Sequence, residues 1–180
     1  NKYSSSADFG IGFSPRLSGP LSVNAMVTNG SGYKKSENDT YKKMSLQLVT
    51  GEKNLSKNEG INFGGVFSYE PYHKDSVTLV SGVFAGYHKN TLRAGLEISR
   101  LTKQMSQSLL SGYLNWDVKN SYNIYCRYDV NKSKNSSNGY LIVGAGYSPE
   151  TSLTISPNYR LFSKGKDSES LFVVNFQFSF

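Results

Sequence analysis

Residues 171–180 read LFVVNFQFSF, and their apolar side chains recur at every second position. In an extended strand, one face would carry Phe172, Val174, Phe176, Phe178 and Phe180. The other face begins apolar and becomes polar toward the end, with asparagine, glutamine and serine. A period of two indicates a β-strand with one apolar and one polar side. What the apolar side contacts decides the fold.

The same alternation recurs along almost the whole chain. Residues 151–161, TSLTISPNYRL, place Leu153, Ile155 and Tyr159 on one side and serine, threonine, asparagine and arginine on the other. We expect eleven such strands, each roughly eight to thirteen residues long. They lie near residues 7–14, 21–28, 41–49, 60–70, 76–88, 91–99, 105–118, 121–130, 139–148, 151–161 and 171–180.

Two features favour strands that cross a membrane. Strands of soluble proteins have about 5–6 residues, whereas a tilted strand that spans a bilayer needs about 9–11. The polar face is rich in small polar residues, and tyrosines on the apolar face suggest the aromatic girdles of membrane barrels. The tyrosines expected near strand ends are Tyr69, Tyr87, Tyr122, Tyr128, Tyr147 and Tyr159. The sequence therefore predicts an all-β fold, an antiparallel up-and-down transmembrane β-barrel, with residues 1–180 as a single domain.

Composition narrows the function classes. The chain of 180 residues has a formal net charge of +7 and one cysteine, Cys126, which cannot form an internal disulfide. This charge permits an acidic partner, but a sheet that binds nucleic acid needs basic and aromatic side chains on one face. Here the basic residues concentrate in the connections, and the aromatics gather on the apolar face. We expect no nucleic-acid partner.

The connections test the barrel hypothesis. Outer-membrane barrels alternate short periplasmic turns with longer external loops. With the C-terminus at the periplasmic edge, residues 29–40 and 131–138 become external loops, whereas residues 51–59, GEKNLSKNE, are long for a periplasmic turn. Single-chain bacterial barrels have an even number of strands. We therefore expect this chain to be the C-terminal portion of a larger barrel, or to lack one N-terminal strand.

The C-terminal strand resembles the closing signature of bacterial outer-membrane β-barrels. That resemblance implies a membrane-assembly signal at Phe176, Phe178 and Phe180, read by the barrel-assembly machinery. The segments ADFGIGFSP, LSVNAMVTNGSGY, CRYDVN and GAGYSPETSLTISPNYR, with this strand, resemble the C-terminal half of porins of the phosphate-selective O/P type. The family implies an anion-leaning diffusion pore.

Charged residues on the polar face are the candidate functional residues. A charge on the lipid face costs roughly 2–4 kcal/mol at the membrane midplane, so we expect these side chains to point inward. They could set ion preference as a charged pore lining, or brace the barrel wall as salt bridges, with Arg93 near Glu97 and Arg127 near Asp129. The expected pore-lining residues are Arg93, Glu97, Asp117, Arg127, Asp129, Asn158 and Arg160.

Catalysis has little support in the sequence. His73 and His88 are the only histidines and fall in different segments, so we expect no catalytic site, metal site or cofactor. Pro157 would remove a hydrogen bond from an interior strand, and it requires a local bulge.

The predicted function is passive diffusion of small hydrophilic solutes through the outer membrane, with a mild anion preference. The expected partners are outer-membrane lipid, small hydrophilic or anionic solutes and the barrel-assembly machinery. They could also include further copies of the chain. Two alternatives stay open at this point. One is a plugged structural or adhesive barrel, and the other is a soluble all-β binding protein.

Overall fold

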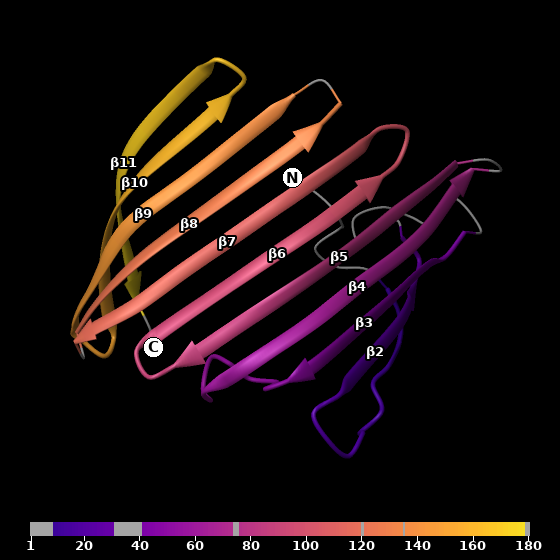
Figure 1. The fold of residues 1–180 in the computed structure, drawn as a ribbon, viewed down its shortest axis with the longest axis horizontal. Helices are drawn as coiled ribbons and strands as arrows, with labels where there is room; N and C mark the ends of the chain where they lie inside the picture. The colour runs from indigo at the N-terminus through magenta and orange to yellow at the C-terminus, as the bar shows by residue number, and fades with distance from the viewer. Residues whose placement is uncertain (1–8, 31–40, 74–75, 120, 135, 179–180) are drawn as a thin grey trace.

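A computed structural model describes residues 9–30, 41–73, 76–119, 121–134 and 136–178. Eleven strands form one antiparallel sheet in which every strand pairs with its neighbours in sequence (Figure 1). The strands are β1 (Gly10–Phe13), β2 (Ser22–Thr28), β3 (Lys43–Gly51), β4 (Gly60–His73), β5 (Ser76–Lys89), β6 (Leu92–Thr102), β7 (Ser106–Lys119), β8 (Tyr122–Ser133), β9 (Ser137–Glu150), β10 (Leu153–Lys164) and β11 (Asp167–Phe178). The predicted number, order and direction of the strands are confirmed.

The sheet is strongly curved and open. Its two edges curl toward the same side, so that one face is convex and the other concave (Figure 1). The edge strands are β1 and β11, which do not pair with each other in the described part of the chain. An open, curved up-and-down sheet is consistent with a partial barrel. No helix among the described residues is long and apolar enough to cross a membrane.

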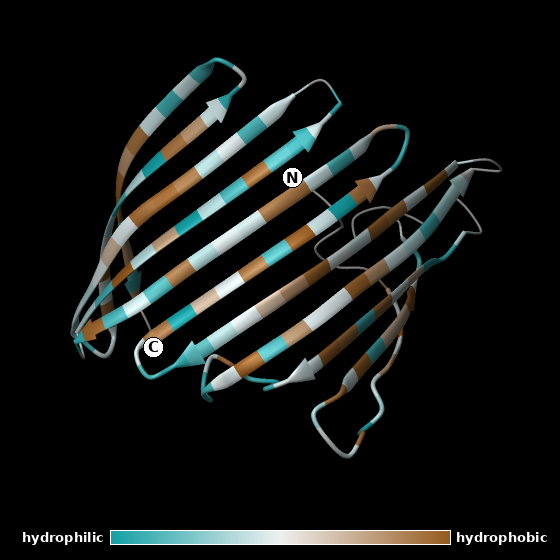
Figure 2. Ribbon diagram, in the orientation of Figure 1, coloured by the Kyte–Doolittle hydropathy of each residue, from teal (hydrophilic) through white to brown (hydrophobic). Residues whose placement is uncertain are grey.

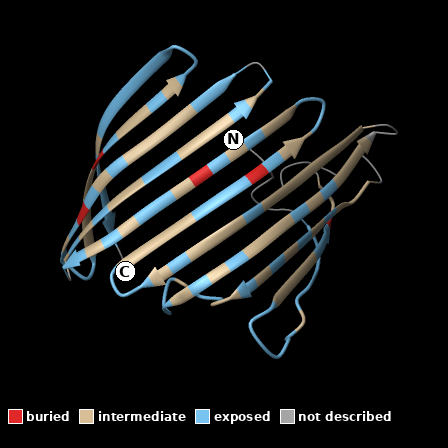
Figure 3. Cartoon of the chain, viewed as in Figure 1, coloured by how far each residue is buried: buried red, intermediate tan, exposed pale blue. Residues whose placement is uncertain are grey.

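The burial pattern is the reverse of that in a soluble protein. Among the described residues no hydrophobic side chain is buried, and the buried residues are Gly146 and four polar ones: Thr28, Ser99, Ser111 and Asn158 (Figure 3). Phe176 on β11 is 61% exposed and Leu96 on β6 is 53% exposed, whereas Asn158 is 2% exposed. A soluble sandwich buries its apolar face between two sheets. The described residues form one sheet without a second layer packed on its apolar face, which argues against the soluble alternative.

The strand register assigns each side chain to one face, because directly paired residues share a face. Paired rows such as Val83–Ile98–Leu110–Val130 are apolar and cross the convex face. Two residues further along each strand, the next row on this face is polar. It comprises Ser81, Arg100, Ser108, Lys132 and Ser137. This row ends an apolar band on the convex face, and the alternation along single strands is visible in Figure 2.

The height of this band matches a membrane. At about 3.4 Å per residue and a tilt of roughly 40°, the stretch from Leu110 to Val118 of β7 spans about 21 Å along the membrane normal. Outer-membrane barrels have apolar bands of about 25 Å. The lone cysteine, Cys126, pairs with Leu114 and Val143 inside the band, so it lies on the apolar face.

The tyrosines follow the expected girdle only in part. Tyr122 and Tyr147 lie at the ends of β8 and β9, and their rings stack with centroids 4.8 Å apart. Tyr128 and Tyr159 instead pair with Gly112 and Val143 near the middle of their strands. The prediction that these two tyrosines lie near strand ends was wrong, because the alternation extends beyond the segments from which the ends were judged.

Two further expectations need correction or refinement. Residues 131–138 are not a long loop, since β8 continues to Ser133 and β9 begins at Ser137, which leaves a short turn. The pairing of β10 with β9 is irregular just before Pro157, with a register shift between Leu153 and Ile155. The bulge that Pro157 required therefore lies on its N-terminal side, and β10 remains one strand.

Candidate functional site

All seven predicted pore-lining residues point to the concave face. Arg93, Asn115, Tyr125, Gly144 and Asn158 form one paired row across β6 to β10. The neighbouring row contains Gly95, Tyr113, Arg127, Ile142 and Arg160. The remaining three residues lie an even number of positions from these on the same strands, so they share the concave face. They are Glu97, Asp129 and Asp117, in the adjacent rows. The three arginines therefore come from alternate strands, β6, β8 and β10, on one polar surface.

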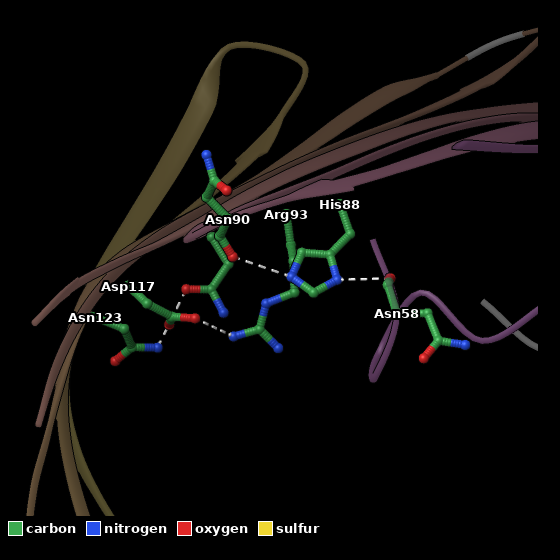
Figure 4. A network of polar contacts seen from close by, with 7 residues as sticks. Asn58, His88, Asn90, Arg93, Asp117 and Asn123 are labelled. Atoms are coloured by element: carbon green, nitrogen blue, oxygen red, sulfur yellow. Dashed lines mark hydrogen bonds and ion pairs between the residues drawn. The ribbon is translucent and has the colours of Figure 1, made fainter. Parts of the chain in front are cut away.

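Arg93 forms an ion pair with Asp117 rather than with Glu97. Its Nη2 donates to the Asp117 Oδ2 over 2.8 Å, and both side chains are about one-third exposed (Figure 4). Residues i and i+4 of a strand lie about 13 Å apart, so Glu97 is too far along β6 to reach Arg93. The sequence-based pairing of Arg93 with Glu97 was wrong. The Arg93 Nε is buried and has no hydrogen-bond partner among the described residues.

Arg127 and Asp129 form the second ion pair, as expected from the sequence. The Arg127 Nε donates to both carboxylate oxygens of Asp129, over 3.1 and 3.0 Å. Ser111 on β7 donates to the same carboxylate and accepts a hydrogen bond from the Arg127 Nη2. Arg127 is half exposed and Asp129 is mostly buried. The pair is thus fixed on the wall while its guanidinium remains open to the concave side.

Of these three arginines, Arg160 is the one whose hydrogen-bond partner is a neutral side chain, that of Asn158. Its Nε donates to the Asn158 Oδ1 over 2.7 Å, and the Asn158 Nδ2 donates to the carbonyl oxygen of Ser156 over 3.0 Å. The hydroxyl of Tyr125 lies 2.7 Å from the hydroxyl of Ser156. Among the described residues no carboxylate pairs with Arg160, so its positive charge is not locally compensated.

Aromatic rings on the concave face lean over glycines of the neighbouring strand. Phe84 covers Gly64, Tyr113 covers Gly95 and Tyr125 covers Gly144, and each ring belongs to the directly paired residue. A Cβ at Gly144 would lie 2.6 Å from the Tyr125 hydroxyl and 2.8 Å from the Asn158 Cβ. Glycine is required here because a ring occupies the space of its side chain. The glycines were visible in the sequence, but their cross-strand partners were not.

Residues 52–59, the long connection between β3 and β4, fold over the concave face. Leu55 packs above Gly86 on β5, where an added Cβ would lie 2.7 Å from the Leu55 Cδ1. The Asn62 Nδ2 donates to the carbonyl oxygen of Glu52, and the Glu59 Oε1 accepts from the Asn90 backbone N–H over 2.8 Å. The unusual length of this connection was the sequence signal, and its inward direction explains that length.

The segment is braced internally by Glu52. Its Oε1 accepts hydrogen bonds from the Asn58 Nδ2 over 3.0 Å and from the Asn54 backbone N–H over 2.8 Å. These bonds, first that of Asn58 and then that of Asn54, lower the pKa of Glu52 below its ordinary value of 4.5. The carboxylate therefore stays ionised down to mildly acidic pH and holds the turn together.

A cavity of about 450 Å³ lies between residues 52–59 and the concave wall. The segment contributes Leu55 and Ser56 to its lining. The wall contributes, from β6 to β8, Arg93, Tyr113, Asn115, Tyr125 and Arg127. The cavity thus has arginine N–H groups, tyrosine rings and an amide along one side, and the apolar residues Leu55 and Ile142 also line it.

The predicted assembly signal lies on the last strand. Phe176 and Phe178 are exposed on the convex face of the edge strand β11, paired with Ile155 and Leu153. Phe180 lies outside the described residues. The position of these phenylalanines agrees with the alternation in the sequence, and their role in assembly stays a prediction.

No protein-family model and no curated protein matches the sequence. Among solved structures, a porin superposes with a TM-score of 0.70 at 11% sequence identity, over 95% of this chain and 61% of the porin chain. The chain thus spans less than two thirds of that porin. The KdgM porin, alone and in complex with disordered oligogalacturonate, gives TM-scores of 0.47 at 13% and 14% identity, over 95% of this chain and 91% of the other. The first similarity confirms a porin-type β-barrel fold.

Proposed function

We propose that this chain forms a large part of a porin-like channel in the bacterial outer membrane, through which small hydrophilic solutes diffuse passively. The observation that supports this most is the pairing of an exposed apolar convex face with a polar concave face on one sheet. A bilayer can cover the first face, and water can fill the space beside the second. The porin-type fold supports the same proposal.

The proposal includes a mild anion preference and a kinship with the phosphate-selective O/P-type porins. The net charge of +7 and the locally uncompensated Arg160 support the preference. Arg93 and Arg127 contribute less net charge because each has a carboxylate partner. The proposed partners are outer-membrane lipid, small anionic or neutral solutes and the barrel-assembly machinery, with further copies of the chain in the same membrane. We propose no enzymatic role.

A plugged structural barrel is the second candidate, and residues 52–59 favour it because they occupy part of the concave side. The cavity beside them argues for a passage that is narrowed rather than closed.

Reconstitution of the purified protein in planar bilayers tests the proposal. A diffusion channel gives discrete conductance steps, with a reversal potential in a KCl gradient that indicates chloride preference. A plugged barrel gives no steps although the protein is membrane-inserted. Swelling of liposomes in solutions of neutral sugars provides a second test, because it measures solute passage without relying on current.

A further inference from the structure

His88 joins residues 52–59 to the turn between β5 and β6. Its Nδ1 lies 2.8 Å from the carbonyl oxygen of Asn58, and its Nε2 lies 3.2 Å from the carbonyl oxygen of Asn90 (Figure 4). A carbonyl oxygen only accepts hydrogen bonds, and a neutral imidazole has a single N–H. Both contacts are hydrogen bonds only when His88 carries two protons and a positive charge.

Loss of one proton changes the attachment. The deprotonated ring nitrogen would present its lone pair to a carbonyl oxygen, so one of the two contacts becomes repulsive. The contact to Asn58 is the shorter of the two, so a neutral ring would keep its proton on Nδ1 and the contact to Asn90 would become repulsive. The bond that holds residues 52–59 would then lose its charge assistance and weaken. Histidine is the side chain whose unperturbed pKa allows a change of charge between about pH 5 and 8.

The charges around His88 act in both directions. Arg93 is its direct partner on β6 and opposes a positive ring, although Asp117 pairs with Arg93. Residues 52–59 bring Glu52 and Glu59, which favour a positive ring, together with the lysines at 53 and 57, which oppose it. Lys89, the next residue on β5, points to the opposite face of the sheet. The residue of β4 that pairs with His88 is the uncharged Gly60.

We propose that residues 52–59 form the constriction of the channel and that protonated His88 holds them in this position. The inference rests on the proposed channel function and assigns its narrowest passage to the cavity between Leu55 and the wall carrying Arg93 and Arg127. At acidic pH the segment is attached at both ends, and the passage is narrow. At mildly alkaline pH the attachment to Asn58 weakens, the segment moves more freely, and the passage widens.

Thiol labelling of Leu55→Cys in a Cys126→Ser background tests the attachment. The rate of reaction with a small methanethiosulfonate reagent is divided by that of Lys166→Cys, in the exposed turn between β10 and β11, at each pH. This ratio cancels the change in thiolate fraction. We expect it to rise about threefold from pH 5.5 to pH 8, because a charge-assisted hydrogen bond is roughly twice as strong as a neutral one. A ratio that stays constant overturns the role of His88.

Variants of the two histidines sharpen the test. In His88→Gln the labelling ratio should become independent of pH, because the side chain no longer titrates. In His73→Gln, which replaces the only other histidine, the pH dependence should persist. A pH dependence that survives in His88→Gln contradicts the proposal.

Single-channel conductance tests the constriction itself. The protein with its native Leu55 should conduct more at pH 8 than at pH 5.5, whereas His88→Gln should give one value at both. Unchanged conductance together with changed labelling means that residues 52–59 move without limiting the passage, and it overturns their assignment as the constriction. Absence of any conductance with the same labelling result overturns the proposed channel and leaves the attachment by His88 supported.

Discussion

The convex and concave faces consist of the same eleven strands, yet they are stabilised in different ways. On the convex face Leu96, Ile98 and Phe176 are more than half exposed, so the protein itself does not cover them. On the concave face Ser111, Asp129 and their neighbours satisfy one another through hydrogen bonds and ion pairs. One face therefore requires an apolar medium, and the other is complete in water. The first three predictions below place matched changes on the two faces.

The largest difference should come from an arginine at adjacent positions of β6. Leu96→Arg places the charge near the middle of the convex band and should lower the free energy of unfolding by about 2–4 kcal/mol in lipid vesicles. Glu97→Arg places it on the concave face and should change stability little, while it increases chloride preference. Urea unfolding in vesicles measures both. Equal destabilisation by the two variants would mean that the faces do not differ in their surroundings.

A smaller difference should follow from adding a methyl group at two glycines. Gly144→Ala on the concave face collides with the Tyr125 ring and with the Asn158 Cβ, and it should cost about 1–3 kcal/mol. Gly112→Ala on the convex face meets its nearest side-chain atom, the Leu96 Cδ1, at 3.5 Å and should be nearly neutral. The urea midpoints of unfolding of the two variants measure this difference in stability. Similar midpoints would contradict the packing of Tyr125 over Gly144.

Removal of wall charges should affect selectivity more than stability. The Arg127–Asp129 pair is partly exposed, so Arg127→Gln should cost only about 0.2–1 kcal/mol. The reversal potential of Arg127→Gln should indicate a weaker chloride preference than that of the unchanged protein, and that of Asp129→Asn should indicate a stronger one. Arg100→Gln, at the polar limit of the convex band, serves as the control and should leave the reversal potential unchanged. A shift in the control as large as that in Arg127→Gln would show that selectivity reflects total charge alone.

The smallest effect should be confined to residues 52–59. The depressed pKa of Glu52 means that its ionised form is favoured in the folded segment, so its contribution is complete above pH 4.5 and is lost as the pH falls through the lower, folded value. Glu52→Gln should release the segment even at neutral pH, and it should increase labelling of Leu55→Cys without altering global stability. Unchanged labelling in this variant would show that Glu52 does not brace the turn.

The sequence predicted the strands and the two faces because both follow from a period of two within each segment. The faces of Arg127, Asn158 and Phe176 needed no knowledge of neighbouring strands. Partners across strands were not predictable, since they depend on register. The pairing of Arg93 with Asp117, and the cover that Tyr125 provides for Gly144, join residues that are 24 and 19 positions apart (117 − 93 and 144 − 125).

The position of residues 52–59 was beyond local pattern for a related reason. Their length marked them as unusual for a turn, but their direction depends on Gly86, His88 and Asn90 of a later hairpin. The turns after β8 and β10 are, in contrast, shorter than the sequence predicted. Their serines and lysines indicate loops by composition, whereas strand pairing continues through several of these residues.

Fluorescence quenching of Trp116 tests the central assignment of the faces most directly. Trp116 is the only tryptophan, it is 48% exposed, and it pairs with Leu92 and Ile124 on the convex face. In vesicles, phospholipids with brominated acyl chains should quench its emission strongly, whereas aqueous iodide should have little effect. Strong quenching by iodide with none by the brominated lipid would place the convex face in water, and it would contradict both the membrane assignment and the channel built on it.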